Sequence, residues 1–112
     1  MRNSDYDPAV IPAIVLAAGR STRMGRLKAT LPVDDRDTFL TRIIRTFNEA
    51  MVADVTVVLG YEASNVSRTV GQSGLSPRLV INDAFDNGQF SSLLVGLNAI
   101  DRPGVMRHFA CR

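Results

Sequence analysis

The chain has 112 residues, of which 46% are hydrophobic and 21% charged, and its formal net charge at pH 7 is +2. This length allows one domain with its own core, and the composition excludes a disordered, collagenous or coiled-coil protein. The single cysteine, Cys111, cannot form an internal disulfide, which excludes a disulfide-stapled scaffold and fits a reducing compartment. We therefore expect a single domain over residues 1–112.

An apolar run over residues 9–18 follows a short polar N-terminal segment. A secretory signal peptide needs a basic start and an unbroken apolar core, whereas here two acids accompany the one base and Pro12 interrupts the run. The run is also too short to cross a bilayer. We expect a cytoplasmic protein without membrane contact, in which residues 1–11 form a flexible N-terminal segment.

Strand-like and helix-like segments then alternate along the chain. Three short apolar segments rich in β-branched residues predict strands at 13–17, 55–59 and 78–81. Apolar residues spaced three or four apart predict helices at 37–51, 62–70 and 91–100, and Asp37 or Thr38 can cap the first of them. A fourth strand is expected over 105–110. This alternation is typical of an α/β protein with an open parallel sheet built from βαβ units.

The loop after the first predicted strand is the natural place for a ligand, because open parallel sheets bind ligands at the carboxyl ends of their strands. The small residues Ala17, Ala18 and Gly19 let a ligand approach the backbone, whose N–H groups can point at phosphate oxygens. Further along, Arg23 offers a planar fork for two phosphate oxygens and Lys28 a mobile positive charge. These residues predict a phosphate-binding loop.

The same loop concentrates positive charge, with Arg20, Arg23, Arg26 and Lys28 close together and no acid among them. The rest of the chain carries a small net negative charge. A basic cluster on a slightly acidic chain favours a local anion site over a nucleic-acid-binding face. A solvent-exposed basic turn is the alternative that composition leaves open.

Two common phosphate loops do not fit this segment. A dinucleotide-binding fingerprint needs Gly-x-Gly-x-x-Gly, but only Gly19 and Gly25 are present and they are too far apart. A Walker A loop needs Gly-x-x-x-x-Gly-Lys followed by Ser or Thr. Here the glycine spacing is one residue too long, the lysine does not follow the second glycine, and Ala29 stands where the hydroxyl would be.

The loop as a whole resembles a different signature: Leu-Ala-Ala-Gly-x-Ser-x-Arg-Met-Gly-x-x-Lys from Leu16 to Lys28, followed by Leu31-Pro32. This is similar to the signature of the sugar-nucleotide and molybdenum-cofactor nucleotidyltransferases, above all the molybdenum cofactor guanylyl- and cytidylyltransferase-like branch. A second segment, from Gly88 to Leu97, resembles that family's Gly-x-x-x-Ser-x-x-x-Gly-Leu pattern, and Asn82 also fits. The chain therefore looks like the N-terminal portion of such an enzyme.

The resemblance implies a Rossmann-like nucleotidyltransferase fold. It also implies transfer of a nucleoside monophosphate from CTP or GTP to a phosphorylated acceptor such as molybdopterin, with release of pyrophosphate. It assigns Arg23 and Lys28 to catalysis, where positive charge neutralises the phosphates. It assigns nucleotide binding to nine residues: Leu16, Ala17, Ala18, Gly19, Arg23, Lys28, Asn82, Gly88 and Ser92.

Residues beside these motifs carry weaker expectations. Arg20 and Arg26 occupy variable positions of the signature, so we expect both to be solvated. A serine near the start of a helix can cap the helix or bind a ligand. We expect Ser91 to cap the predicted helix, while for Ser92 both roles stay open.

The resemblance also implies Mg²⁺, which the family holds through an aspartate directly after the fourth strand. The last residues of this chain contain no such acid, and we expect turn roles for Asp83 and Asp86, so no metal ligand is predicted within the chain. Residues 106–112 form an atypical tail, because basic side chains replace the expected apolar strand. The domain is therefore expected to be truncated after the fourth strand.

Three functions stay open on these grounds. The chain is an active nucleotidyltransferase, a non-catalytic nucleotide-binding module, or an inactive fragment of such an enzyme. By itself it is expected to bind nucleotide weakly and not to turn over. The expected partners are a nucleoside triphosphate and a small phosphorylated acceptor, with neither nucleic acid nor membrane among them.

Overall fold

The computed structural model describes residues 11–20, 22–23 and 25–100, and its elements follow the predicted alternation. The three strands lie at the predicted positions: β1 (Ala13–Ala17), β4 (Val55–Leu59) and β5 (Arg78–Ile81). The three α-helices are α1 (Phe39–Glu49), α2 (Ala63–Gln72) and α3 (Gln89–Ala99). The predicted α/β class with an open parallel sheet is confirmed.

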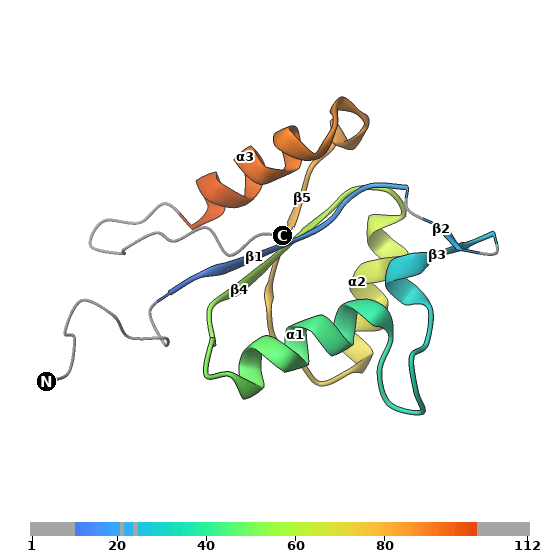
Figure 1. Cartoon of the computed structure of the whole chain (residues 1–112). Coiled ribbons are helices and arrows are strands. Elements are labelled where there is room, and N and C mark those ends of the chain that lie inside the picture. The colour runs from blue at the N-terminus through green and yellow to red at the C-terminus, as the bar shows by residue number, and fades with distance from the viewer. Residues whose placement is uncertain (1–10, 21, 24, 101–112) are drawn as a thin grey trace, which may run out of the picture.

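The sheet has the strand order β1-β4-β5, and both pairings are parallel. In register, Ala13 of β1 lies opposite Val55 of β4, and Thr56 of β4 lies opposite Arg78 of β5. Figure 1 shows α1 and α2 on one face of the sheet and α3 on the other. Because the strands are parallel, their carboxyl ends share one edge of the sheet, where the loops that follow β1, β4 and β5 lie.

Successive side chains of the central strand enter two different apolar clusters, as a sheet covered on both faces requires. Val57 belongs to the cluster beneath α1 and α2, together with Ile44. Its neighbour Val58 belongs to the cluster beneath α3, together with Ile14 and Ile100. Each of these side chains is at most 2% exposed. The strands are therefore apolar at nearly all positions, with Thr56 in β4 and Arg78 in β5 as the exceptions.

Two glycines allow elements to approach more closely than a side chain would permit. At Gly96 of α3, a Cβ atom would lie 2.9 Å from Ile14 Cγ2 and 3.1 Å from Val58 Cγ2, so the helix backbone lies directly on the sheet. At Gly60, directly after β4, a Cβ atom would lie 2.6 Å from Phe85 Cβ and 2.8 Å from the Ala18 carbonyl oxygen. The loops after β1, β4 and β5 are therefore in direct contact.

The helix ends differ from the predicted ones by about two residues. Helix α1 begins after Thr38, which forms a capping box with Thr41 as the sequence allowed, and it ends before Met51, whose φ of +69° is left-handed. Helix α3 begins at Gln89 with Gly88 as its N-cap residue. The prediction that Ser91 caps this helix was wrong, because the turn at Gly88, with φ +99°, starts the helix two residues earlier.

The loop after β1 contains a small hairpin that the sequence did not predict. Strand β2 (Thr22–Arg23) pairs antiparallel with β3 (Arg26–Leu27) around Gly25, whose φ is +77°. A 3₁₀-helix, η2 (Lys28–Thr30), follows without a break. A second one, η3 (Phe85–Asn87), lies in the loop before α3.

A buried carboxylate holds the start of α1. The side chain of Asp37 has no exposed surface, and it accepts hydrogen bonds from Nε and Nη2 of Arg45 at 3.0–3.2 Å, from Nε of Arg42 at 3.1 Å and from Oγ1 of Thr41 at 3.1 Å. The Arg45 guanidinium is the main reason that the pKa of Asp37 falls to about 2. This network ties the segment before α1 to the outer side of the helix.

Three predictions fall outside the described residues: most of the flexible segment 1–11, the fourth strand at 105–110 and the atypical tail at 106–112. In the part of the chain that the structure describes, no helix is long and apolar enough to cross a membrane.

Candidate functional site

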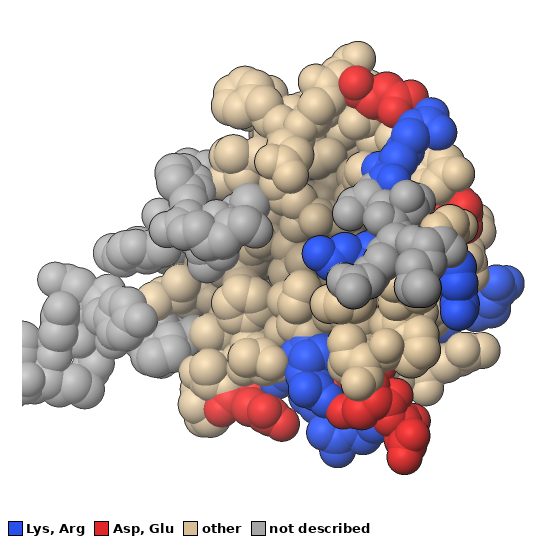
Figure 2. Space-filling model, turned by 45° about the vertical axis from the view of Figure 1, so that its right-hand side comes forward, with Lys and Arg blue, Asp and Glu red and all other residues tan. Residues whose placement is uncertain are grey.

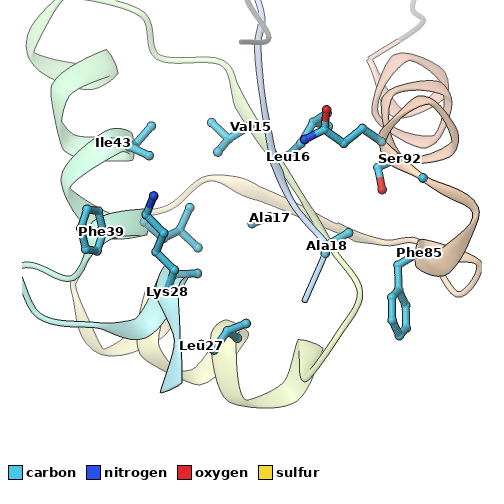
Figure 3. Close-up of a pocket in the computed structure, with 15 residues that line it drawn as sticks. Val15, Leu16, Ala17, Ala18, Leu27, Lys28, Phe39, Ile43, Phe85 and Ser92 are labelled. Atoms are coloured by element: carbon cyan, nitrogen blue, oxygen red, sulfur yellow. The ribbon is translucent and has the colours of Figure 1, made fainter. Parts of the chain in front are cut away.

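A hollow of about 410 Å³ opens at the carboxyl end of β1. Figure 3 shows the residues of β1 between Lys28 and Phe39 on one side and Ser92 and Phe85 on the other. Its size is in the range of small-molecule pockets. The predicted nucleotide-binding residues all line it except Arg23 and Asn82: Leu16, Ala17, Ala18, Gly19, Lys28, Gly88 and Ser92.

The two exceptions differ in kind. Arg23 lies in β2, and its side chain is outside the described part of the chain, so its contact with phosphate stays a prediction. Asn82 is only 4% exposed, and instead of lining the hollow it is hydrogen-bonded to Ser92, which does.

The backbone of the turn after β1 is held by a hydrogen bond at Ala18 and is exposed to solvent at Gly19. The Ala18 carbonyl accepts a hydrogen bond from the Tyr61 N–H at 2.8 Å, and Ala18 itself is 3% exposed. Gly19 is exposed, and a Cβ atom built there would meet nothing within 4 Å. A ligand can therefore approach the backbone at Gly19 closely, which is the property expected of a phosphate-binding turn.

Lys28 supplies the positive charge on one side of the hollow. It begins η2, directly after the hairpin, and its Nζ lies 5.3 Å from the centre of the Phe39 ring on α1. Among the described lining residues it is the one with a charged side chain. A cation held against an aromatic face and open to solvent can attract a phosphate group.

On the opposite side, Asn82 organises the entry to α3. Its Oδ1 accepts a hydrogen bond from the Ala84 N–H at 3.0 Å, and its Nδ2 donates to Oγ of Ser91 at 3.0 Å and of Ser92 at 2.9 Å. The Gly88 carbonyl in turn accepts from the Ser91 hydroxyl at 2.8 Å. The amide of Asn82 thus links the end of β5 to the first turn of α3.

Arg20 is exposed to solvent, as expected, and it also connects the turn after β1 to the loop before α3. Its Nε and Nη2 donate to both carboxylate oxygens of Asp86, at 3.0 and 2.9 Å. Its guanidinium also lies over the rings of Tyr61 and Phe85, 4.7 and 5.3 Å from their centres. The hydrogen bonds from Arg20 lower the pKa of Asp86 below its usual range. Asp86 therefore has a definite ion-pair partner in addition to its place in a turn.

The sequence did not predict the apolar part of the site. Leu27, Leu40, Ile43 and Phe85 line the hollow together with Phe39. Phe39 and Ile43 belong to the apolar stripe whose spacing predicted the helix at 37–51, and that spacing did not assign them to a ligand site. Ile43 is nevertheless 43% exposed, because this part of the stripe faces the hollow. An apolar stripe wider than the core requires was the signal that could have shown it.

The described residues do not fit the Mg²⁺ site that the family resemblance implies. Among them, no group of three or more His, Cys, Asp or Glu side chains could hold a metal ion. The hollow has no carboxylate among its described lining residues, whereas Mg²⁺ is bound through carboxylate oxygens. Asp86 is paired with Arg20 instead.

Several of the described arginines form ion pairs with aspartates. Arg42 pairs with Asp34 and Asp37, and Nη1 of Arg78 lies 3.4 Å from Oδ1 of Asp54. Figure 2 shows a face on which basic and acidic side chains adjoin at the upper right and along the lower edge, while further basic side chains lie near its centre and at its right.

The family of the chain follows from a comparison with models of known protein families. The model of the MobA-like NTP transferase domain matches residues 13–108. The chain belongs to the MobA-like NTP transferase family. The matched residues include β1, the loop after it and all of α3, so the elements around the hollow are those of the family. A comparison with proteins of curated function gave no match.

Two solved structures support this membership. A nucleotidyl transferase from Methanothermobacter thermautotroptrophicus is 32% identical with a TM-score of 0.72, and Rv0371c from Mycobacterium tuberculosis H37Rv is 30% identical with a TM-score of 0.70. Each comparison covers 90% of this chain. The chain spans only 49% and 50% of the lengths of these two relatives.

Proposed function

We propose that the chain binds a nucleoside triphosphate, CTP or GTP, for transfer of its nucleoside monophosphate to a phosphorylated acceptor such as molybdopterin. The observation that carries this proposal is the meeting of two segments with family motifs around one hollow. Leu16 to Lys28 and Gly88 to Ser92 are distant in sequence and line the same space. Membership of the MobA-like NTP transferase family supports nucleotidyl transfer in general.

In this reaction an acceptor oxygen attacks the α-phosphorus, and pyrophosphate leaves. Negative charge builds up on the phosphoryl oxygens and on the leaving group, so the protein has to neutralise it. The assignment of Lys28 to this role is supported by its position, because it carries the positive charge among the described lining residues. Arg23 is assigned the same task by its position in the signature.

The remaining site assignments also rest on the resemblance to the family's sequence motifs. Backbone groups of Leu16, Ala17, Ala18 and Gly19 would frame the triphosphate, while Gly88 and Ser92 would contact the sugar or base. The single cysteine of the chain is consistent with a cytoplasmic location. We derive no catalytic step through Mg²⁺, because the described residues do not form its site.

Nucleotide binding is the first test. Isothermal titration of residues 1–112 with CTP and with GTP should give saturable binding, and Lys28→Ala should weaken it about tenfold through loss of a charge-assisted hydrogen bond. Arg26→Ala is the matched control. It removes a positive charge from β3, two residues before Lys28, but Arg26 is not among the residues that line the hollow, so a change within about twofold is expected. Absence of saturable binding of either nucleotide would refute the proposal.

A non-catalytic nucleotide-binding module is the second candidate. The absence of a carboxylate among the described lining residues favours it over an enzyme that acts alone. Release of pyrophosphate from CTP or GTP in the presence of Mg²⁺ and molybdopterin separates the two, because only an enzyme releases it with repeated turnover.

A further inference from the structure

Lys28 differs from most arginines of the described part of the chain in what holds its charge. Five of those arginines form ion pairs with aspartates: Arg20, Arg36, Arg42, Arg45 and Arg78. Among the described residues, the ammonium group of Lys28 has neither a hydrogen bond nor an ion pair, and its partner is the ring of Phe39, whose centre lies 5.3 Å from Nζ. A carboxylate would cancel the charge of the lysine, whereas a neutral ring attracts the cation and leaves its charge in place.

The backbone fixes the lysine and the ring relative to each other. Leu31, which follows η2, donates its N–H to the Lys28 carbonyl at 3.1 Å, and its own carbonyl accepts from the Phe39 N–H at 2.9 Å. Phe39 is also the first residue of α1, directly after the capping box of Thr38. The ring therefore stays beside Lys28 whether or not a ligand is bound.

The contact lies at the wall of the hollow, which both residues line. Figure 3 shows the Lys28 side chain lying beside the Phe39 ring. Lys28 is exposed, and a long exposed side chain loses rotamer freedom when it is fixed to a ligand. A ring that already favours one direction of this side chain lowers that loss, and at an exposed site the effect amounts to about two- to fivefold in an equilibrium constant.

We propose that the ring of Phe39 holds the Lys28 ammonium group at the hollow without neutralising it, so that its full charge acts on the phosphates of the bound nucleotide. This inference rests on the proposed function. Lys28 would contact the phosphates directly, and Phe39 is a positioning residue that acts through Lys28.

The first test weakens the ring while nearly keeping its shape. Replacing Phe39 with 4-fluoro-, 3,5-difluoro- and 3,4,5-trifluorophenylalanine withdraws electrons from the ring face step by step, so its attraction for a cation falls. The dissociation constant of inorganic tripolyphosphate, which has neither sugar nor base, should rise in the same order, to about two- to fivefold for the trifluoro ring. The dissociation constant of the tighter-binding nucleotide, CTP or GTP, should follow the same order.

Phe47 is the matched control for this series. It lies on the same helix, but it is not among the residues that line the hollow. The same three fluorinated rings at Phe47 should leave both dissociation constants unchanged. A graded response at Phe39 alone is an effect that a purely structural role of the ring would not give.

The second test asks whether the partner of Lys28 has to be neutral. Phe39→Glu and Phe39→Gln both remove the ring and have nearly the same shape, but only the glutamate can pair with Lys28 and cancel its charge. An acid is favourable at the first position of a helix, so the fold should tolerate it. Tripolyphosphate should bind Phe39→Glu roughly tenfold more weakly than Phe39→Gln. In the Lys28→Ala background this difference should shrink to the direct repulsion between glutamate and phosphate. An equal difference in both backgrounds would show that position 39 does not act through Lys28.

The outcomes distinguish the two proposals. If wild type binds neither nucleotide, the proposed function fails. If wild type binds a nucleotide and Lys28→Ala weakens the binding, but the fluorinated Phe39 chains bind as wild type does, only the inference about Phe39 is wrong. Equal weakening by the series at Phe39 and at Phe47 would also overturn it, because fluorine would then act on the packing of α1.

Discussion

The two sides of the hollow are held in place by different kinds of interaction. The α1 side is anchored by a buried charge, since Asp37 binds Arg42 and Arg45 on the outer side of the helix. The α3 side is anchored by the neutral amide of Asn82 and by close packing at Gly96. On the α1 side, Lys28 is the one charged side chain among the described residues that line the hollow. On the α3 side, the hollow is lined by the neutral side chain of Ser92. The residues that hold α1 thus differ from Lys28, which carries charge into the hollow, whereas on the α3 side Asn82 is hydrogen-bonded to Ser92, which itself lines the hollow.

The largest effect is expected at Asp37. Asp37→Asn keeps the shape of the side chain but removes the charge that pairs with two arginines, so the melting temperature should fall on the order of 10 °C. Differential scanning calorimetry measures this. Asp35→Asn is the control, since Asp35 is exposed and lies two residues away, and it should leave the melting temperature nearly unchanged. A similar, small change in both variants would show that the α1 side is not anchored by charge.

A somewhat smaller effect is expected where α3 touches the sheet. In Gly96→Ala, the added methyl group would press on Ile14 and Val58, and such overpacking costs about 1–3 kcal/mol. Alanine favours a helix over glycine by about 1 kcal/mol, so the free energy of urea unfolding should fall by a net amount of up to about 2 kcal/mol. Gly71→Ala in α2 is the control, because a Cβ atom there meets nothing within 4 Å and should stabilise the helix.

The dependence of the melting temperature on pH should also differ between the α1 side and the α3 side of the hollow. The pKa of Asp37 is about 2 in the folded chain, against about 3.9 for an unperturbed aspartate. Its contribution is therefore complete above pH 4–5 and is lost as the pH falls toward 2. The difference in melting temperature between wild type and Asp37→Asn should shrink over this range. A constant difference from pH 5 to pH 2 would contradict the lowered pKa.

The smallest effect is expected at the exposed pair of Arg20 and Asp86, whose side chains are 56% and 64% exposed. Water and salt screen such a pair, so Asp86→Asn should lower the melting temperature by no more than about 2 °C, and 0.5 M NaCl should remove most of that change. Nucleotide affinity should stay within about threefold. A rise in affinity for tripolyphosphate would show instead that Asp86 normally keeps Arg20 away from phosphates.

The strands could be predicted from the sequence because each is a short segment whose own residue types favour a buried strand. Val55–Leu59 is apolar at every position except Thr56 and β-branched at every position except Leu59, as is typical of a strand buried on both faces. The hairpin around Gly25 was not predicted, since strands of two residues are too short to show an alternation. The ends of α1 and α3 depend on left-handed residues, Met51 and Gly88, and the first of these carries no glycine signal.

Part of the site could be predicted because several of its residues are close together in the sequence. Leu16 to Gly19 and Lys28 belong to one continuous motif, so the sequence alone brings them together. The pairing of Arg20 with Asp86 joins positions 66 residues apart, and the role of Asn82 depends on which of its two side-chain atoms faces Ala84. Neither can be predicted from spacing, because both follow from how the loops after β1 and β5 meet in space.

The close contact at Gly60 has a consequence for how this sequence can change over evolution. A side chain there would collide with Ala18 on one loop and with Phe85 on another. The three positions must therefore vary together, and a relative with alanine at the position of Gly60 should carry a smaller residue opposite it or a longer loop before α3. Such covariation across three loops would leave a trace in the family's sequences that no single position reveals.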